Sequence, residues 1–255
     1  MSTFDRNSST RFGVGTGPAA RAEAAAIDQG LRSYMLRVYN YMASGLAITG
    51  VAALATFWAA IDPAGQNGLS AFGEAIYLSP LRWVVILAPL AVVFLFSMKI
   101  QSMSVGTAQA VFWAFAALMG LSLSSIFLVY TGESITRVFF ITAASFGALS
   151  LYGYTTSKSL SGWGSFLFMG LIGIVIASLV NIFIGSSALQ FAISVIGVLV
   201  FAGLTAYDTQ QIKEMYLASD STATMGQKAI MGALRLYLDF INLFTMLLQL
   251  FGNRN

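Results

Sequence analysis

Residues 229–251 read AIMGALRLYLDFINLFTMLLQLF, a stretch that is mostly apolar and long enough to cross a bilayer as a helix. Polar side chains recur along it at spacings of 4, 3, 3 and 4 residues: Arg235, Asp239, Asn242, Thr245 and Gln249. These spacings place them on one helix face. A polar stripe is costly against lipid, so we expect this face to line the protein interior or a water-filled path.

The composition of the whole chain also indicates a membrane protein. Of its 255 residues, 57% are hydrophobic and only 9% are charged, whereas soluble domains carry about 25% charged residues. The chain has no Cys and no His, which excludes disulfides, thiolate chemistry and imidazole catalysis or ligation. A net charge of +3 without a basic cluster argues against nucleic-acid binding.

Cutting the chain at charges, Pro residues and Gly/Ser clusters leaves apolar segments of membrane-spanning length. The sequence therefore predicts an all-α membrane protein with seven transmembrane helices. Their approximate bounds are Val38–Ile61, Trp83–Met103, Val105–Tyr130, Val138–Ser157, Phe166–Ile184, Leu189–Leu217 and Ala229–Phe251.

Residues 1–30 are rich in Ser, Thr, Gly, Ala and Arg, and they contain no apolar run. We expect them to form a disordered cytoplasmic tail, followed by a transmembrane domain over residues 31–255. With the N-terminus inside, nine Lys and Arg residues fall on the inner side and three on the outer side. This bias predicts a cytoplasmic N-terminus and, with seven spans, an external C-terminus.

Three charges lie well away from the ends of predicted spans, where an ionisable residue marks a candidate functional site: Asp208, Arg235 and Asp239. Asp208 lies about nine residues before the end of the sixth span, and Asp239 lies ten residues after the start of the seventh. Consecutive antiparallel helices would bring the two carboxyl groups to a similar depth. Two close carboxylates in a low dielectric cannot both ionise cheaply, so the pair could sense pH without histidine.

The same pair could bind a cation. Carboxylate oxygens are hard ligands suited to Ca²⁺, although Asn242, carbonyls or water would have to complete so small a site. Weak, transient binding is what a conducting pathway needs. The alternative is a structural network in which Arg235 and Asp239 pair as i, i+4 neighbours.

Lys99 lies near the inner end of the second span. Its side chain either reaches the cytoplasmic headgroups or turns inward to pair with Asp208 or Asp239, holding a closed state.

Several sequence blocks, in this order and spacing, resemble the Bax inhibitor-1 family, also called the transmembrane Bax inhibitor motif family. They are MKIQSMSVGTAQAVFWAFAALMGLSLSSIF at 98–127, GYTTSKSLSGWGSFLFMGLIGIVIASLVNIF at 153–183, AYDTQQI at 206–212 and LRLYLDFINLFTMLLQLFG at 234–252. The resemblance covers roughly residues 97–252 and is typical of a bacterial member.

This resemblance implies a fold in which the C-terminal helix is central and the other six wrap around it. It also implies a pH-sensitive calcium leak channel whose sensor is an aspartate pair, here Asp208 and Asp239. The family's arginine on the second helix is replaced by Lys99. We therefore expect a multi-pass protein of the bacterial inner membrane, with Ca²⁺ as permeant ion, no tightly bound cofactor and no enzyme activity.

Two other functions remain open. Some relatives are similar to regulators of a membrane protease or of stress responses, so the chain could act through a membrane-protein partner. Two aspartates on adjacent helices also suggest an intramembrane aspartyl protease. However, Asp239 lies in YLDF rather than in a Gly-x-Gly-Asp context, and no Pro-Ala-Leu element follows.

Overall fold

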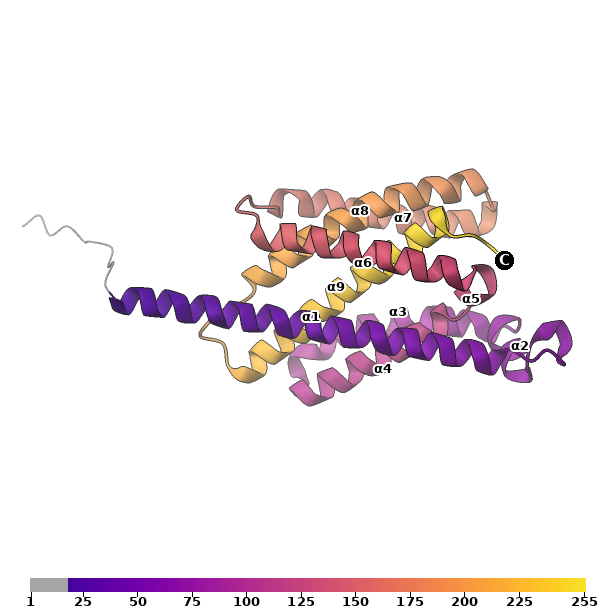
Figure 1. The fold of residues 1–255 in the computed structure, drawn as a ribbon, viewed down its shortest axis with the longest axis horizontal. Helices are drawn as coiled ribbons and strands as arrows, with labels where there is room; N and C mark the ends of the chain where they lie inside the picture. The colour runs from indigo at the N-terminus through magenta and orange to yellow at the C-terminus, as the bar shows by residue number, and fades with distance from the viewer. Residues whose placement is uncertain (1–17) are drawn as a thin grey trace, which may run out of the picture.

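The computed structural model describes residues 18–255 as a bundle of long helices joined by short loops (Figure 1). Within these residues, seven helical segments are long and apolar enough to span a membrane, and no strand is present. The predicted all-α class with seven transmembrane helices is therefore confirmed. The long helices are α1 (Pro18–Ala60), α3 (Leu81–Lys99), α4 (Val105–Leu123), α6 (Gly132–Thr155), α7 (Ser161–Ile184), α8 (Ser187–Glu214) and α9 (Thr222–Phe251).

Four short elements complete the chain: η1 (Gln66–Gly68), α2 (Ala71–Tyr77), η2 (Ile100–Ser102) and α5 (Ile126–Val129). The sequence did not predict α2, which lies in the loop between the first two spans. The third predicted span is divided between α4 and α5. At the break, the Ser124 hydroxyl donates to the carbonyl of Leu121 at 2.7 Å and accepts from the Tyr77 hydroxyl at 2.8 Å.

The first helix begins earlier than the sequence suggested. Residues 18–30, predicted to belong to a disordered tail, are helical in α1, while residues 1–17 lie outside the described residues. The run AARAEAAA explains the difference, because Ala, Arg and Glu are strong helix formers and Pro suits the first helical position. The cytoplasmic placement of this end stays a prediction.

Hydroxyl side chains set where several helices start. In each case the Ser or Thr before the helix accepts a hydrogen bond from a backbone N–H in the first turn, which satisfies one otherwise unpaired donor. Gly185 ends α7 with a φ of 65°, a left-handed conformation that glycine adopts without a steric penalty. The capping residues are Ser70, Ser104, Thr131, Ser186 and Ser221.

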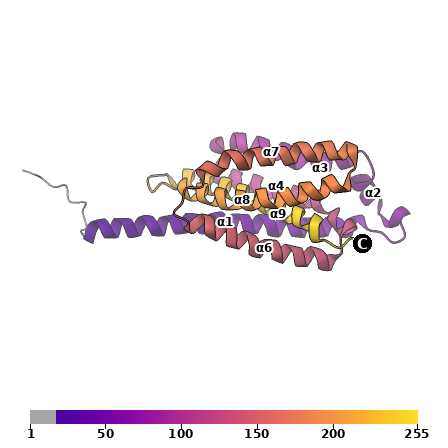
Figure 2. The ribbon, with the colours of Figure 1, turned by 90° about the horizontal axis from the view of Figure 1, so that it is seen from above.

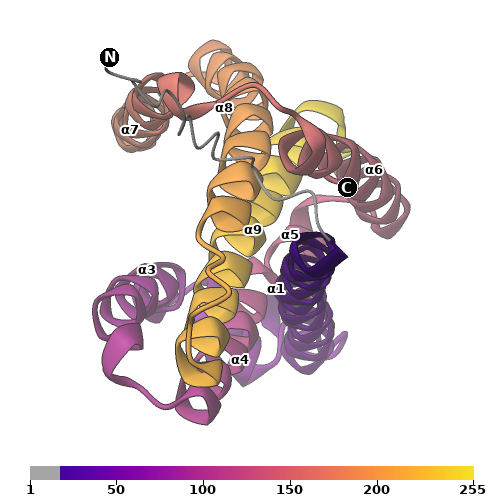
Figure 3. The same ribbon diagram turned by 90° about the vertical axis from the view of Figure 1, so that its left-hand side faces the viewer.

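The helices form three layers, with α3 and α7 on one side, α1 and α6 on the other, and α4, α8 and α9 between them (Figures 2 and 3). Helix α9 packs against α1, α4, α6 and α8, whereas α3 packs chiefly on α4 and α7 on α8. In α9, 67% of the most apolar segment is buried, against 39% in α8 and less in the others. That six helices wrap around α9 stays a prediction.

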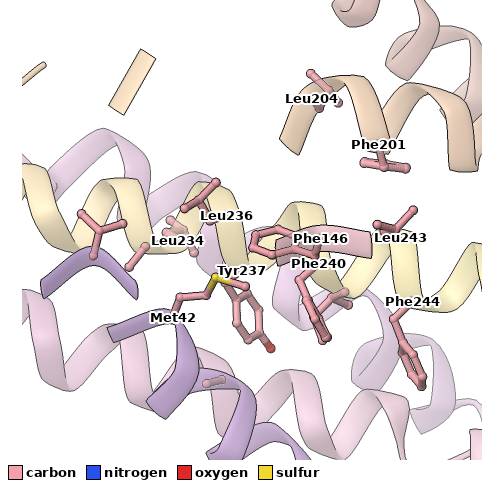
Figure 4. Close-up of a cluster of buried hydrophobic side chains, with 14 of the residues drawn as sticks. Met42, Phe146, Phe201, Leu204, Leu234, Leu236, Tyr237, Phe240, Leu243 and Phe244 are labelled. Atoms are coloured by element: carbon pink, nitrogen blue, oxygen red, sulfur yellow. The ribbon is translucent and has the colours of Figure 1, made fainter. Parts of the chain in front are cut away.

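Close packing depends on aromatic contacts and on small residues. Tyr237 of α9 lies edge-on to Phe112 and Phe115 of α4, with ring centroids 5.9 and 5.7 Å apart. Phe240 makes the same kind of contact with Phe146 of α6 at 5.5 Å (Figure 4). A Cβ atom at Gly120 would collide with the backbone of α1, so glycine permits this approach of α4, as small residues do in membrane bundles.

Candidate functional site

A cavity of about 660 Å³ lies between α7, α8 and α9. Helix α8 contributes Asp208 to its lining, and α9 contributes Arg235, Asp239 and Asn242. Most of the remaining lining is apolar, from side chains such as Phe168 and Leu238. We call this space the aspartate cavity.

The antiparallel pairing of α8 and α9 brings the two aspartates together. The helices are joined by the short loop 215–221 and pack along much of their length. Asp208 lies near the end of α8 and Asp239 near the middle of α9, and both face the aspartate cavity. The two helices thus bring both aspartates to one cavity, and that they act as a sensing pair stays a prediction.

Asp239 is the more enclosed of the two residues, with 5% of its surface exposed, while Asp208 is half-buried. Both carboxyl groups line the same cavity, so their negative charges would repel each other if both were ionised. Within the described part of the chain, Oδ2 of Asp239 has no hydrogen-bond partner. A buried carboxyl oxygen without a partner is costly unless it is protonated or meets water or a cation.

Arg235 lines the same cavity one helical turn before Asp239, and its side chain is exposed. Within residues 25–255 it forms no ion pair with either aspartate; the one ion pair there joins Lys228 to Asp220 at 2.6 Å. The local pair that the i, i+4 spacing suggested is therefore absent. Arg235 instead lines the same cavity as the two aspartates with an exposed, positively charged side chain.

The rest of the polar stripe serves different contacts. Asn242 lines the aspartate cavity, and its Nδ2 donates to the carbonyl of Leu238 at 2.9 Å. The hydroxyl of Thr245 donates to the carbonyl of Asn242, also at 2.9 Å. Gln249 accepts hydrogen bonds from Gln190 at 2.6 Å and Ser194 at 2.8 Å, which tie α9 to α8. That these residues line a pore stays a prediction.

Lys99 does not reach the cavity. It ends α3 with an exposed side chain, and it is not among the residues that line the aspartate cavity. Within residues 25–255 it forms no ion pair. This position favours the interpretation in which Lys99 reaches the membrane headgroups rather than the one in which it pairs with the aspartates.

Sequence reasoning missed the wall that α7 contributes. Gly164 and Ser165, near the start of α7, line the cavity on this side. Tyr207 of α8 lines it next to Asp208. A Cβ atom at Gly164 would collide with the Tyr207 ring, so the glycine admits this aromatic side chain. The available signal was a Gly-Ser pair at the start of an otherwise apolar helix, which is too common to single out.

The donors around the pair suit a weak cation site at most. Within the described residues, no group of three or more His, Cys, Asp or Glu side chains could hold a metal ion. Two carboxylates, the Asn242 amide and hydroxyls of Ser165 and Tyr207 are the oxygen-bearing groups of the cavity. Such a set is too small for a tight calcium site, and weak cation binding there stays a prediction.

The chain is similar to a known protein family and to several bacterial proteins. Residues 31–255 match the protein family described as inhibitor of apoptosis-promoting Bax1. Inner membrane protein YbhL of Escherichia coli K12 is 50% identical over 227 residues, which cover 88% of this chain and 93% of that protein.

Two further relatives come from other bacteria. An uncharacterized protein of Rickettsia prowazekii, RP147, is 48% identical over 227 residues, covering 89% of this chain and 92% of its own. An uncharacterized membrane protein of Streptococcus pyogenes serotype M3 is 35% identical over 242 residues, covering 89% and 96%.

Proposed function

The chain belongs to the Bax inhibitor-1 family of membrane proteins, and from this and the aspartate cavity we propose that it is a pH-sensitive calcium leak channel of the bacterial inner membrane. The observation that carries the proposal is the pairing of Asp208 with the buried Asp239 at one cavity. The calcium selectivity rests on the family resemblance. The placement in the inner membrane rests on the printed name of the Escherichia coli relative.

Proton occupancy of the pair is the proposed sensor. With one shared proton, the carboxyl groups hydrogen-bond and carry a single negative charge, which Arg235 partly balances. When that proton leaves, two like charges face each other in a low dielectric, and this arrangement is stable only if the groups separate or a cation enters. A change of pH thus alters both the packing of α8 against α9 and the affinity of the cavity for cations.

The route away from the pair follows the polar face of α9. Asn242 continues the cavity lining, and the cluster of Gln190, Ser194 and Gln249 lies toward the C-terminal end of the helix. These amides and hydroxyls can exchange hydrogen bonds between one another and water, which lowers the barrier to a hydrated ion. Lys99 has no part in this route.

The test is calcium influx into proteoliposomes that contain the purified protein, measured from pH 5 to pH 8. Asp239→Asn should flatten the pH dependence, because an amide cannot exchange the sensing proton. Glu214→Gln is the matched control, since Glu214 is an exposed acid at the end of α8, outside the cavity. Folded Asp239→Asn protein with the same pH profile as the wild type would overturn the proposal.

A further inference from the structure

A second cavity, of about 630 Å³, lies between α1 and α6. These two helices form the layer opposite α3 and α7 (Figure 2). Helix α1 contributes Met35, Leu36 and Tyr39 to its lining, and α6 contributes Phe146, Gly147 and Leu151. Most of this lining is apolar. We call this space the α1–α6 groove.

The groove is present because α1 and α6 pack mainly against other helices and not against each other. Helix α1 packs chiefly on α4 and α9, while α6 packs on α8 and α9. A hydrogen bond of 2.7 Å between the hydroxyls of Tyr39 and Ser150 links α1 to α6 across the groove. Gly147 widens the groove, because a Cβ atom there would meet no other atom within 4 Å.

Both walls of the groove carry exposed apolar side chains. Leu36 on one wall is 52% exposed and Leu151 on the other is 62% exposed, although both lie within helices of membrane-spanning length. Its volume lies within the range of about 300–1,000 Å³ that is common for small-molecule sites. An apolar space of this kind suits an acyl chain.

One end of the groove is cationic. Arg32 lines it there, six residues and hence about 9 Å before Val38, where the apolar run of the first span begins. Its side chain is exposed, and within residues 25–255 it forms no ion pair. Close by, the Lys213 ammonium group donates to the carbonyl of Tyr154, another lining residue, at 2.8 Å. An anionic group at this end would meet the positive charge of Arg32.

We propose that the α1–α6 groove binds an anionic glycerophospholipid, with an acyl chain between α1 and α6 and the headgroup phosphate at Arg32. The planar guanidinium group can bind two phosphate oxygens at once, while Met35, Leu36, Phe146 and Leu151 contact the chain. Charge complementarity selects the occupant, since an apolar protein segment would leave Arg32 without an anionic partner. This site is separate from the aspartate cavity, which lies between α7, α8 and α9.

The test measures lipid binding to the full-length, delipidated protein in detergent by native mass spectrometry. Phosphatidylglycerol and phosphatidylcholine with identical acyl chains are titrated separately, so that only the headgroup charge differs. The wild type should bind phosphatidylglycerol about fivefold more tightly, as expected for one basic side chain near an anionic headgroup. Arg32→Gln should remove this preference. Arg37→Gln should keep it, because Arg37 is an exposed arginine of the same helix that does not line the groove.

Variants that fill the groove test whether it binds the acyl chain of the lipid. Gly147→Leu places a side chain in the open space and should weaken the binding of both lipids, as should Leu151→Trp, a second variant at an exposed position. Gly173→Leu is the matched control, since a Cβ atom at Gly173 on α7 also meets nothing within 4 Å.

Three results would overturn the proposal. One is the absence of a headgroup preference in the wild type, and another is equal loss in Arg32→Gln and Arg37→Gln, which indicates a general surface charge effect. The third is unchanged lipid binding in both groove-filling variants. If Gly147→Leu instead converts a dimer to a monomer without altering lipid binding, the groove holds a second copy of the chain.

Discussion

The hydroxyl of Tyr237 on α9 lies 2.7 Å from the hydroxyl of Thr49 on α1, inside the bundle. Thr49 is also within 3.0 Å of the carbonyl of Gly45 and 2.9 Å of the carbonyl of Ala116 on α4. A threonine has a single proton to donate, so when it bonds to a carbonyl, Tyr237 donates to it. The contact therefore joins three helices at one buried point.

We predict that Tyr237→Phe lowers the free energy of unfolding by about 1 kcal/mol, the usual net value of one hydrogen bond. The ring contacts with Phe112 and Phe115 remain, so the loss reports on the hydroxyl alone. This free energy can be measured by unfolding the protein in mixed micelles with an increasing fraction of denaturing detergent. Tyr152→Phe serves as the control, because Tyr152 is 51% exposed. Equal stability of Tyr237→Phe and the wild type would contradict the assignment.

Gln210 holds the loop between α6 and α7. Its Oε1 accepts from the N–H of Leu160 at 2.7 Å, and its Nε2 donates to the carbonyl of Lys158 at 2.9 Å. Gln210→Leu leaves both backbone groups without this partner, and we expect a loss of about 2 kcal/mol. Amide hydrogen exchange should also become faster at residue 160. The neighbouring Gln211→Leu, which removes only a contact of 3.3 Å with Glu214, should leave that exchange rate unchanged.

Gly120 allows α4 to touch the backbone of α1 at Thr49 and Ala53. Gly120→Leu forces the helices apart, and we expect it to cost about 2–3 kcal/mol, as overpacking does. Gly106→Leu on the same helix meets open space and should be tolerated. A thermal unfolding midpoint of Gly120→Leu equal to that of Gly106→Leu would show that this contact does not limit packing.

Substitutions of Arg235 and Lys99 should have different effects on the pH dependence of calcium flux. Removing the charge at Arg235 makes a doubly ionised aspartate pair less stable, so Arg235→Gln should move the pH midpoint of calcium flux to higher pH. Lys99→Gln should leave the midpoint in place, because Lys99 does not line the aspartate cavity. The same proteoliposome assay compares both variants. If the pH midpoint shifted in Lys99→Gln but not in Arg235→Gln, Lys99 rather than Arg235 would be the basic residue that acts on the aspartates.

The features that depend on local physical constraints could be predicted from the sequence. Hydrocarbon thickness sets the length of each span, and the helical period places Asp239 and Asn242 on one face of α9. The proximity of Asp208 and Asp239 followed from two antiparallel helices with a short connection. Features that depend on distant packing were not predictable: the wall that α7 adds at Ser165, and the groove between α1 and α6. The sequence did not predict the start of α1 at Pro18, because residues 18–30 contain no apolar run and only their helix propensity favours a helix.

The pairing of Asp208 with Asp239 is tested most directly by a double-variant comparison of calcium flux across pH. Asp208→Asn, Asp239→Asn and the variant carrying both changes are reconstituted at equal density, beside wild type and Glu214→Gln. If one shared proton sets the response, each single change removes the pH dependence and the double change adds nothing further. Independent, additive shifts of the pH midpoint, or a wild-type profile in all three variants, would contradict the account.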